Sequence, residues 1–190
     1  MENGRDPGAA IGESRGTLWT IGHSTRSFEE FHALLAEHRI QFLADVRHFP
    51  TSQRVPWTAK ASLAKALPDS GIAYEHFEAL GGYRKVRPDS VNLGWRNRGF
   101  RGYADYMASP EFLTGLDRLI ASAAERRTAI MCAEAVPWKC HRSLLSDALL
   151  VHGVRVIHIL SPGKTDDHRL TAFARVHGTR ITYPVTRKGD

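Results

Sequence analysis

The chain has 190 residues, of which 42% are hydrophobic and 24% are charged, values typical of one globular domain with a substantial core. Lysine and arginine total 26 against 20 acidic residues, and the formal net charge of +6 favours anionic partners. No stretch approaches the roughly 20 consecutive apolar residues of a transmembrane helix, so we expect no membrane association.

Residues 1–16 are rich in glycine and polar residues, and we predict that they form a flexible N-terminal tail. This segment lacks the apolar core of a secretory signal, and two cysteines are too few for a disulfide framework. We therefore expect a cytoplasmic protein whose thiols are reduced.

The first half of the chain alternates predicted strands and helices. Short apolar, β-branched runs predict the strands, and apolar residues at 3.6-residue spacing predict the helices. Ser27 and Glu30 have the spacing of a capping box at the start of the first helix. The predicted order is strand 17–22, helix 28–39, strand 41–46, helix 58–67 and strand 72–80.

The second half continues the alternation. Ser109 and Pro110 are suited to the N-cap and first position of a helix, and Gly153 is suited to the end of another. Residues 128–134 form a nearly continuous apolar run, which is typical of a central strand covered on both faces. A further helix from Cys140 and a strand over 154–160 complete the pattern. It predicts a single Rossmann-like α/β domain over 17–190, with a largely parallel sheet between two helical layers.

Polar residues follow several of the predicted strands. Ligands of open parallel sheets bind beyond the carboxyl ends of the strands, where these side chains should collect. Buried polar groups need solvent, each other or a ligand, so the convergence indicates a site. The residues expected at this edge are His23, Asp45, Arg47, Glu134, Cys140, His141 and Arg142.

Each candidate also has a structural interpretation. Asp45 could pair with Arg47, and Glu134 could pair with Arg47 or Arg142, instead of acting as a general acid or base. His23 could cap the next helix. Cys132, inside an apolar strand, is expected to be a small buried hydrophobic residue.

Cys140 differs from Cys132, since it stands at the N-terminus of a predicted helix and has Lys139 and Arg142 beside it. Both features lower a thiol pKa, so Cys140 is a candidate thiolate, with an inert cysteine as the alternative. A metal site is not predicted. Cys132 and Cys140 lack the two-to-four-residue spacing of structural zinc ligands, and adjacent Cys140 and His141 have poor chelating geometry on a helix.

The segment over 81–102 is predicted to be a long basic loop. It contains six lysines and arginines and a single acidic residue, with aromatic residues interleaved. Loops of this length are usually functional or disordered, and cations mixed with aromatics suit a phosphate backbone with stackable bases. A solvated excursion whose aromatics pack into the core is the alternative. The predicted phosphate-binding residues are Arg47, Arg54, Arg84, Arg98 and Arg142.

Several motifs occur in the order of a known family. They are TIGHSTRSFEEF, LADVRHFPTS, LGGYR, YADYM and MCAEAVPWKCHRSLLSDAL, over about residues 17–160. The sequence resembles the bacterial and archaeal family catalogued as domain of unknown function 488. Because that family has no assigned reaction, the resemblance supports the fold and the position of the site. The motif positions it picks out are His23, Asp45, Arg47, Pro50, Gly81, Gly82, Glu134, Cys140, His141 and Arg142.

The leading hypothesis is an enzyme that acts on nucleic acid or another phosphate-bearing substrate. Glu134 or Asp45 would be the general acid or base, His23 or His141 would move protons, and the arginines would hold phosphate. The alternatives are a non-catalytic nucleic-acid-binding module and a thiol-dependent enzyme that uses Cys140. No sequence pattern indicates a cofactor or an oligomeric state.

Overall fold

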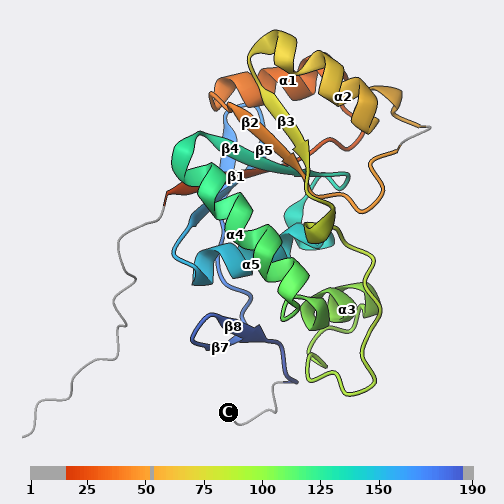
Figure 1. Ribbon diagram of the computed structural model, residues 1–190, viewed down its shortest axis with the longest axis vertical. Helices are drawn as coiled ribbons and strands as arrows, with labels where there is room; N and C mark the ends of the chain where they lie inside the picture. The colour runs from red at the N-terminus through yellow and green to blue at the C-terminus, as the bar shows by residue number, and fades with distance from the viewer. Residues whose placement is uncertain (1–15, 52–53, 186–190) are drawn as a thin grey trace, which may run out of the picture.

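The computed structural model describes residues 16–51 and 54–185, and its centre is a six-stranded sheet (Figure 1). The strand order is β3-β2-β4-β1-β5-β6, in which β6 alone runs antiparallel to its neighbour. The predicted tail lies outside the described residues except for Gly16. The strands are β1 (Thr17–Gly22), β2 (Phe42–Asp45), β3 (Ala73–His76), β4 (Thr128–Cys132), β5 (Arg155–Ser161) and β6 (Lys164–Asp167).

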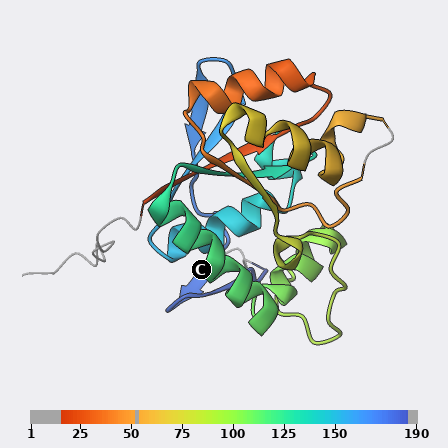
Figure 2. The ribbon, with the colours of Figure 1, turned by 45° about the horizontal axis from the view of Figure 1, so that its top comes forward.

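Helices cover both faces of the sheet, which confirms the predicted three-layer α/β fold. The helices α1 (Phe28–Glu37) and α2 (Lys60–Ala66) lie on one face, and α4 (Pro110–Glu125) and α5 (Arg142–Val151) lie on the other (Figure 1 and Figure 2). Two buried apolar clusters, one under each helical layer, form the core. None of the helices in the described ranges has the length and apolar character of a membrane span.

The N-terminal capping residues predicted for two helices are found at their N-termini, and the predicted central strand is buried. Ser27 and Glu30 form a reciprocal capping box at the start of α1, with both hydrogen bonds present. Ser109 caps α4, and Pro110 occupies its first turn. All five residues of β4 are buried, as predicted for a central strand.

Four segments differ from the prediction. The helix α3 (Arg98–Tyr106) begins inside the predicted loop, because the Asn97 side chain accepts hydrogen bonds from the first backbone N–H groups. The predicted third strand ends at His76 and is followed by a 3₁₀ turn. The exposed strand β6 and the hairpin of β7 (Arg175–His177) and β8 (Arg180–Thr182) were not predicted. The 3₁₀ turns are η1 (Pro56–Thr58), η2 (Pro68–Ser70), η3 (Glu78–Leu80) and η4 (Pro137–Lys139).

The chain path creates a crevice at the carboxyl end of β4. This strand lies between β2 and β1, whose following helices, α2 and α1, pack on one face of the sheet. The segment after β4 instead leads to α5 on the opposite face. Diverging connections from neighbouring parallel strands leave a ligand-binding crevice, so the fold places a site beyond Cys132.

Candidate active site

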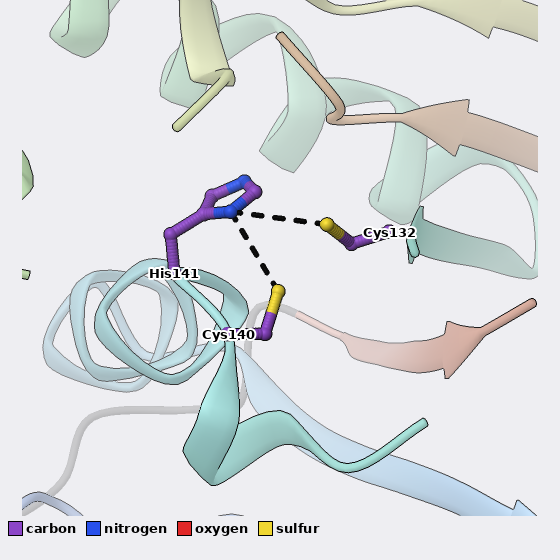
Figure 3. A group of neighbouring side chains, drawn as sticks. All are labelled: Cys132, Cys140 and His141. Carbon is purple, nitrogen blue, oxygen red and sulfur yellow. Dashed lines mark hydrogen bonds between the residues drawn. The ribbon is translucent and has the colours of Figure 1, made fainter. Parts of the chain in front are cut away.

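Both cysteines and one histidine meet at the carboxyl end of β4. Cys132 is the last residue of that strand, and Cys140 and His141 lie at the turn that leads into α5. The Nδ1 atom of His141 lies 3.8 Å from Sγ of Cys132 and 3.6 Å from Sγ of Cys140 (Figure 3). We call these three residues the thiol–imidazole centre.

The His141 ring is held by groups on other elements. Its Nε2–H donates to the carbonyl oxygen of Val46 at 2.9 Å, so in the neutral ring the lone pair of Nδ1 points at the two sulfurs. The Tyr103 ring packs 5.0 Å from it, centroid to centroid. A methyl group on Gly82 would lie 3.0 Å from Nδ1, which explains why glycine stands at this motif position. The ring orientation is therefore built in by the surrounding fold.

The two thiols have different electrostatics although both are buried. A hydrogen bond from the Cys132 thiol, with His141 and Arg142 adding to it, lowers the pKa of Cys140 well below the usual value against the effect of burial. The same hydrogen bond, followed by burial, raises the pKa of Cys132. The backbone N–H of Arg142 also lies 3.5 Å from Sγ of Cys140. The pair therefore favours one thiolate, on Cys140, and one thiol, on Cys132.

Arg142 is itself only 1% exposed and lies beneath the centre. Its guanidinium donates to the carbonyl oxygen of Glu134 and to Oγ1 of Thr20. Thr20 is hydrogen-bonded to His158, His158 to His168, and His168 to the buried carboxylate of Asp147. Arg142 therefore supplies positive charge from below and belongs to a buried polar chain.

A cavity of about 480 Å³ opens above the thiol–imidazole centre. The exposed carboxylate residue Glu134 and the exposed Lys139 lie in its wall. Phe49 and Tyr83, which are 64% and 82% exposed, stand at the same cavity. The lining residues are Arg47, His48, Phe49, Thr51, Gly82, Tyr83, Asn97, Gly99, Phe100, Cys132, Ala133, Glu134, Lys139, Cys140 and His141.

Asp45 and Arg47 form a buried ion pair beside this cavity. Asp45 is fully buried, and its two carboxylate oxygens accept from Nε and Nη2 of Arg47 at 2.8 and 2.5 Å. Tyr74 donates to the same carboxylate, and burial followed by the Asp45 charge raises the pKa of Tyr74. The contacts of Asp45 therefore agree with its structural interpretation, because both carboxylate oxygens already accept hydrogen bonds from Arg47 or Tyr74.

The structure places the other predicted residues as follows. His23 is buried and lies outside the cavity wall; burial lowers its pKa, and its Nδ1 donates to the Ser24 carbonyl. Arg84 donates to the backbone carbonyls of Gly81 and Glu78 and stacks on Tyr106. Arg54 and Arg98 are exposed. The crevice therefore brings together Glu134, Cys140, His141 and Arg47 of the predicted set, with Arg142 beneath them.

The sequence did not reveal that Cys132 contacts His141. It also did not reveal the hydrogen-bonded side chains that lead from Thr20 to Asp147. Cys132 lies in an apolar run, and its burial was predicted while its contact with His141 was not. His158 alternates with apolar neighbours on β5, so only an expected neighbour across the sheet could have drawn attention to it. Phe49 carried a weak signal, as an aromatic residue in a polar loop.

Comparisons with known proteins give one match. The family model described as "Domain of unknown function DUF488" matches residues 27–149. This segment contains the thiol–imidazole centre and every residue that lines the cavity. Comparisons with curated proteins and with solved structures gave no match.

Proposed function

Since the chain belongs to the family described as domain of unknown function DUF488, whose description assigns no activity, we propose a function from the site itself. The protein is an enzyme that acts on a nucleotide-containing, phosphate-bearing substrate bound in the cavity above the thiol–imidazole centre. The observation that carries this proposal is one cavity wall that combines buried reactive groups with exposed aromatic side chains.

The aromatic side chains support a substrate with bases. Phe49 and Tyr83 lie 5.9 Å apart, ring centroid to centroid, and His48 packs against Phe49. Tyr83 has a positive φ of 60°, a strained conformation for a bulky residue, yet its side chain is directed to solvent. Exposed aromatic rings beside a polar cavity are suited to stacking with nucleobases, each stack contributing about 1–3 kcal/mol.

The charges around the cavity support a phosphate group. Lys139 lies in its wall, and the buried Arg142 contributes positive charge from beneath the thiol–imidazole centre. Arg54 and Arg98 are exposed and available to a longer nucleic-acid chain. The formal net charge of +6 adds long-range attraction for a polyanion.

Glu134 is the candidate general acid or base of the cavity. Its side chain is exposed, whereas the carboxylate of Asp45 is buried in an ion pair, so Glu134 is the accessible of the two predicted carboxylates. A proton acceptor beside the reactive centre is what hydrolysis or group transfer requires.

A thiol-dependent enzyme is the second candidate, and the contacts of Cys140 favour it. Its sulfur lies near His141 Nδ1 and the N–H of Arg142, and the Cys132 thiol donates to it. A cysteine thiolate supported in this way is a nucleophile. In that mechanism the Cys140 thiolate forms a bond to the electrophilic atom of the substrate, the leaving group departs with the electron pair of the broken bond, and Cys132 stays a neutral partner.

The test is a binding titration of the full chain with fluorescently labelled single-stranded DNA, duplex DNA and RNA at two salt concentrations. We expect single strands to bind with a steep salt dependence, and the double substitution Phe49→Ser and Tyr83→Ser to weaken binding at least tenfold. Trp138→Ser is the matched control, because Trp138 is 59% exposed but lies outside this cavity.

Equal weakening by the control variant, or no binding of any of the three probes, would overturn the assignment of a nucleic-acid substrate. Binding without turnover of any bound probe by the wild-type protein, with Glu134→Gln binding identically, would favour a non-catalytic nucleic-acid-binding module.

A further inference from the structure

We propose that Cys132, Cys140 and His141 bind one zinc-type divalent metal ion, with its fourth coordination position directed into the cavity. The site follows from the three side chains alone, and its use in catalysis rests on the proposed function. The sequence argument against a metal site used ligand spacing along the chain. The fold removes that objection, because a strand end and a helix start bring the three ligands together.

The distances agree with a tetrahedral metal centre. Zinc bonds of about 2.3 Å to sulfur and 2.0–2.1 Å to nitrogen, at tetrahedral angles, place sulfur and nitrogen ligands about 3.6 Å apart and two sulfurs about 3.8 Å apart. The observed separations from His141 Nδ1 are 3.6 Å to Cys140 and 3.8 Å to Cys132. All three ligand atoms lie within 4.8 Å of one another. A metal ion can therefore be bound with small adjustments of the side chains.

The directions of the ligand atoms agree as well. Figure 3 shows the His141 ring turned so that Nδ1 faces both sulfurs. The other ring nitrogen donates to the Val46 carbonyl, which is the usual second interaction of a metal-binding histidine. The backbone N–H of Arg142 points at the Cys140 sulfur and would stabilise a bound thiolate. The centre thus has both the ligands and their supporting contacts.

The ligand types select the metal. Two thiolates and one imidazole suit zinc and disfavour magnesium and calcium, which prefer oxygen ligands. Three protein ligands with an open position are typical of catalytic zinc, whereas structural sites have four. All three ligands line the 480 Å³ cavity, so the open position is accessible to water or substrate. We therefore assign the site to the catalytic type.

The open position gives the proposed enzyme a nucleophile. A water molecule bound to the metal gives one proton to the Glu134 carboxylate, whose residue lies in the same cavity wall. The water oxygen then forms a bond to the electrophilic atom of the substrate. The leaving group departs with the electron pair of the broken bond and takes up that proton. In this reaction Cys140 is a ligand, which distinguishes it from the thiol-dependent alternative.

The experiment uses the full chain, purified without a polyhistidine tag and with its thiols reduced. Zinc content is measured by mass spectrometry, and the metal-free protein is titrated with Co²⁺ while the absorption spectrum is recorded. We expect one metal ion per chain and, with Co²⁺, thiolate charge-transfer bands together with the intense visible bands of tetrahedral coordination. Less than a tenth of an equivalent of zinc, with no such bands, would overturn the proposal.

Single variants locate the ion. Cys132→Ser, Cys140→Ser and His141→Ala should each weaken Co²⁺ binding at least a hundredfold, whereas His177→Asn, on the exposed strand β7, should bind like the wild type. If a ligand variant fails to fold, the charge-transfer bands of the wild-type protein still decide whether the thiolates bind metal. Undiminished binding by all three ligand variants would contradict the assignment.

The two proposals fail separately. Metal-loaded protein that binds neither DNA nor RNA would retain the metal site and overturn the proposed function. Conversely, metal-free wild-type protein that binds and converts nucleic acid would retain the proposed function and overturn the catalytic role of the metal, leaving the thiol-dependent mechanism in its place.

Discussion

At the scale of single residues, the Asp45–Arg47 pair shows how burial changes the meaning of a charged motif. Asp45 is fully buried and Arg47 is 5% exposed, and each hydrogen-bonding group of the carboxylate has a partner. Nη2 of Arg47 also donates to the Thr58 carbonyl and so connects β2 to the segment before α2. The pair stabilises the base of the cavity and, for the same reason, is unsuited to exchange protons with a substrate.

Asp45→Asn should therefore lower the free energy of unfolding by about 3–5 kcal/mol, because it leaves the buried Arg47 guanidinium without a compensating charge. Urea unfolding at pH 7 measures this loss. Asp89→Asn is the control, since its ion pair with Arg87 is exposed to solvent and should change stability far less. A loss for Asp45→Asn no larger than that for Asp89→Asn would contradict this account.

The residues of the site were only partly predictable. Glu134, Cys140 and His141 were identified because polar residues after a strand must collect at one edge of the sheet. The contact of Cys132 with His141 depends on how the turn from β4 into α5 folds back, and spacing along the chain carries no information on that path. Likewise, no local pattern revealed that Arg142 points down toward Thr20 rather than out to a ligand.

At the scale of elements, the segment after η3 positions the centre from above. Gly82 packs directly against the His141 ring, and Gly81 approaches the backbone of His48, where a methyl group would lie 2.8 Å from Cα. A side chain at Gly81 would therefore collide with the backbone after β2, and one at Gly82 would push the His141 ring out of place.

Gly82→Ala should displace the His141 ring and weaken Co²⁺ binding about 10–100-fold, the effect typical of changes in the groups around metal ligands. The titration described above measures it. Gly99→Ala is a matched control in the same cavity, since its added methyl group would meet only the Asn97 side chain, at 3.1 Å. Equal affinities of the two variants would show that Gly82 does not position the ring.

Helices and strands could be predicted from the sequence where their buried apolar residues follow the period of a helix or a strand. Strands β1, β2, β4 and β5 and helices α1, α4 and α5 have apolar runs or stripes facing one of the two clusters. By contrast, all four residues of β6 and all three of β7 are exposed, so no apolar pattern indicates them. The helix α3 was missed because glycine and arginine dominate its first turn, and its Asn97 cap lay within a loop-like composition.

At the scale of the whole molecule, the buried polar chain from Arg142 to Asp147 joins β1, α5, β5 and the segment after β6. His158, in the middle of this chain, is 5% exposed. Burial, the neighbouring His168 and Arg142, against a smaller effect of Asp167, lower the pKa of His158 to about 3. The folded protein therefore holds this ring neutral at pH values where the unfolded chain protonates it.

The sign of the pH dependence follows from that difference. Above pH 6.5 both states are neutral and His158 contributes nothing; as the pH falls from 6.5 toward about 3, the unfolded state takes up the proton and stability is lost. His158 should contribute roughly 1.4 kcal/mol per pH unit to the loss of unfolding free energy in this range. The free energy of unfolding, measured by chemical denaturation across this range, should fall less steeply with decreasing pH for His158→Gln than for the wild type or for His177→Gln. Identical slopes would contradict the pKa assignment.

The central claim, that substrate binds in the cavity directly over the thiol–imidazole centre, is tested most directly by ligand protection of the thiols. Cys140 and Cys132 are 3% and 7% exposed and both lie in the cavity wall. The rate of alkylation by iodoacetamide would be followed by mass spectrometry in reduced, metal-free protein, with and without saturating single-stranded DNA or RNA. We predict that the bound nucleic acid slows alkylation of Cys140 in proportion to occupancy. An unchanged rate at saturation would place the nucleic acid elsewhere on the molecule and contradict the account.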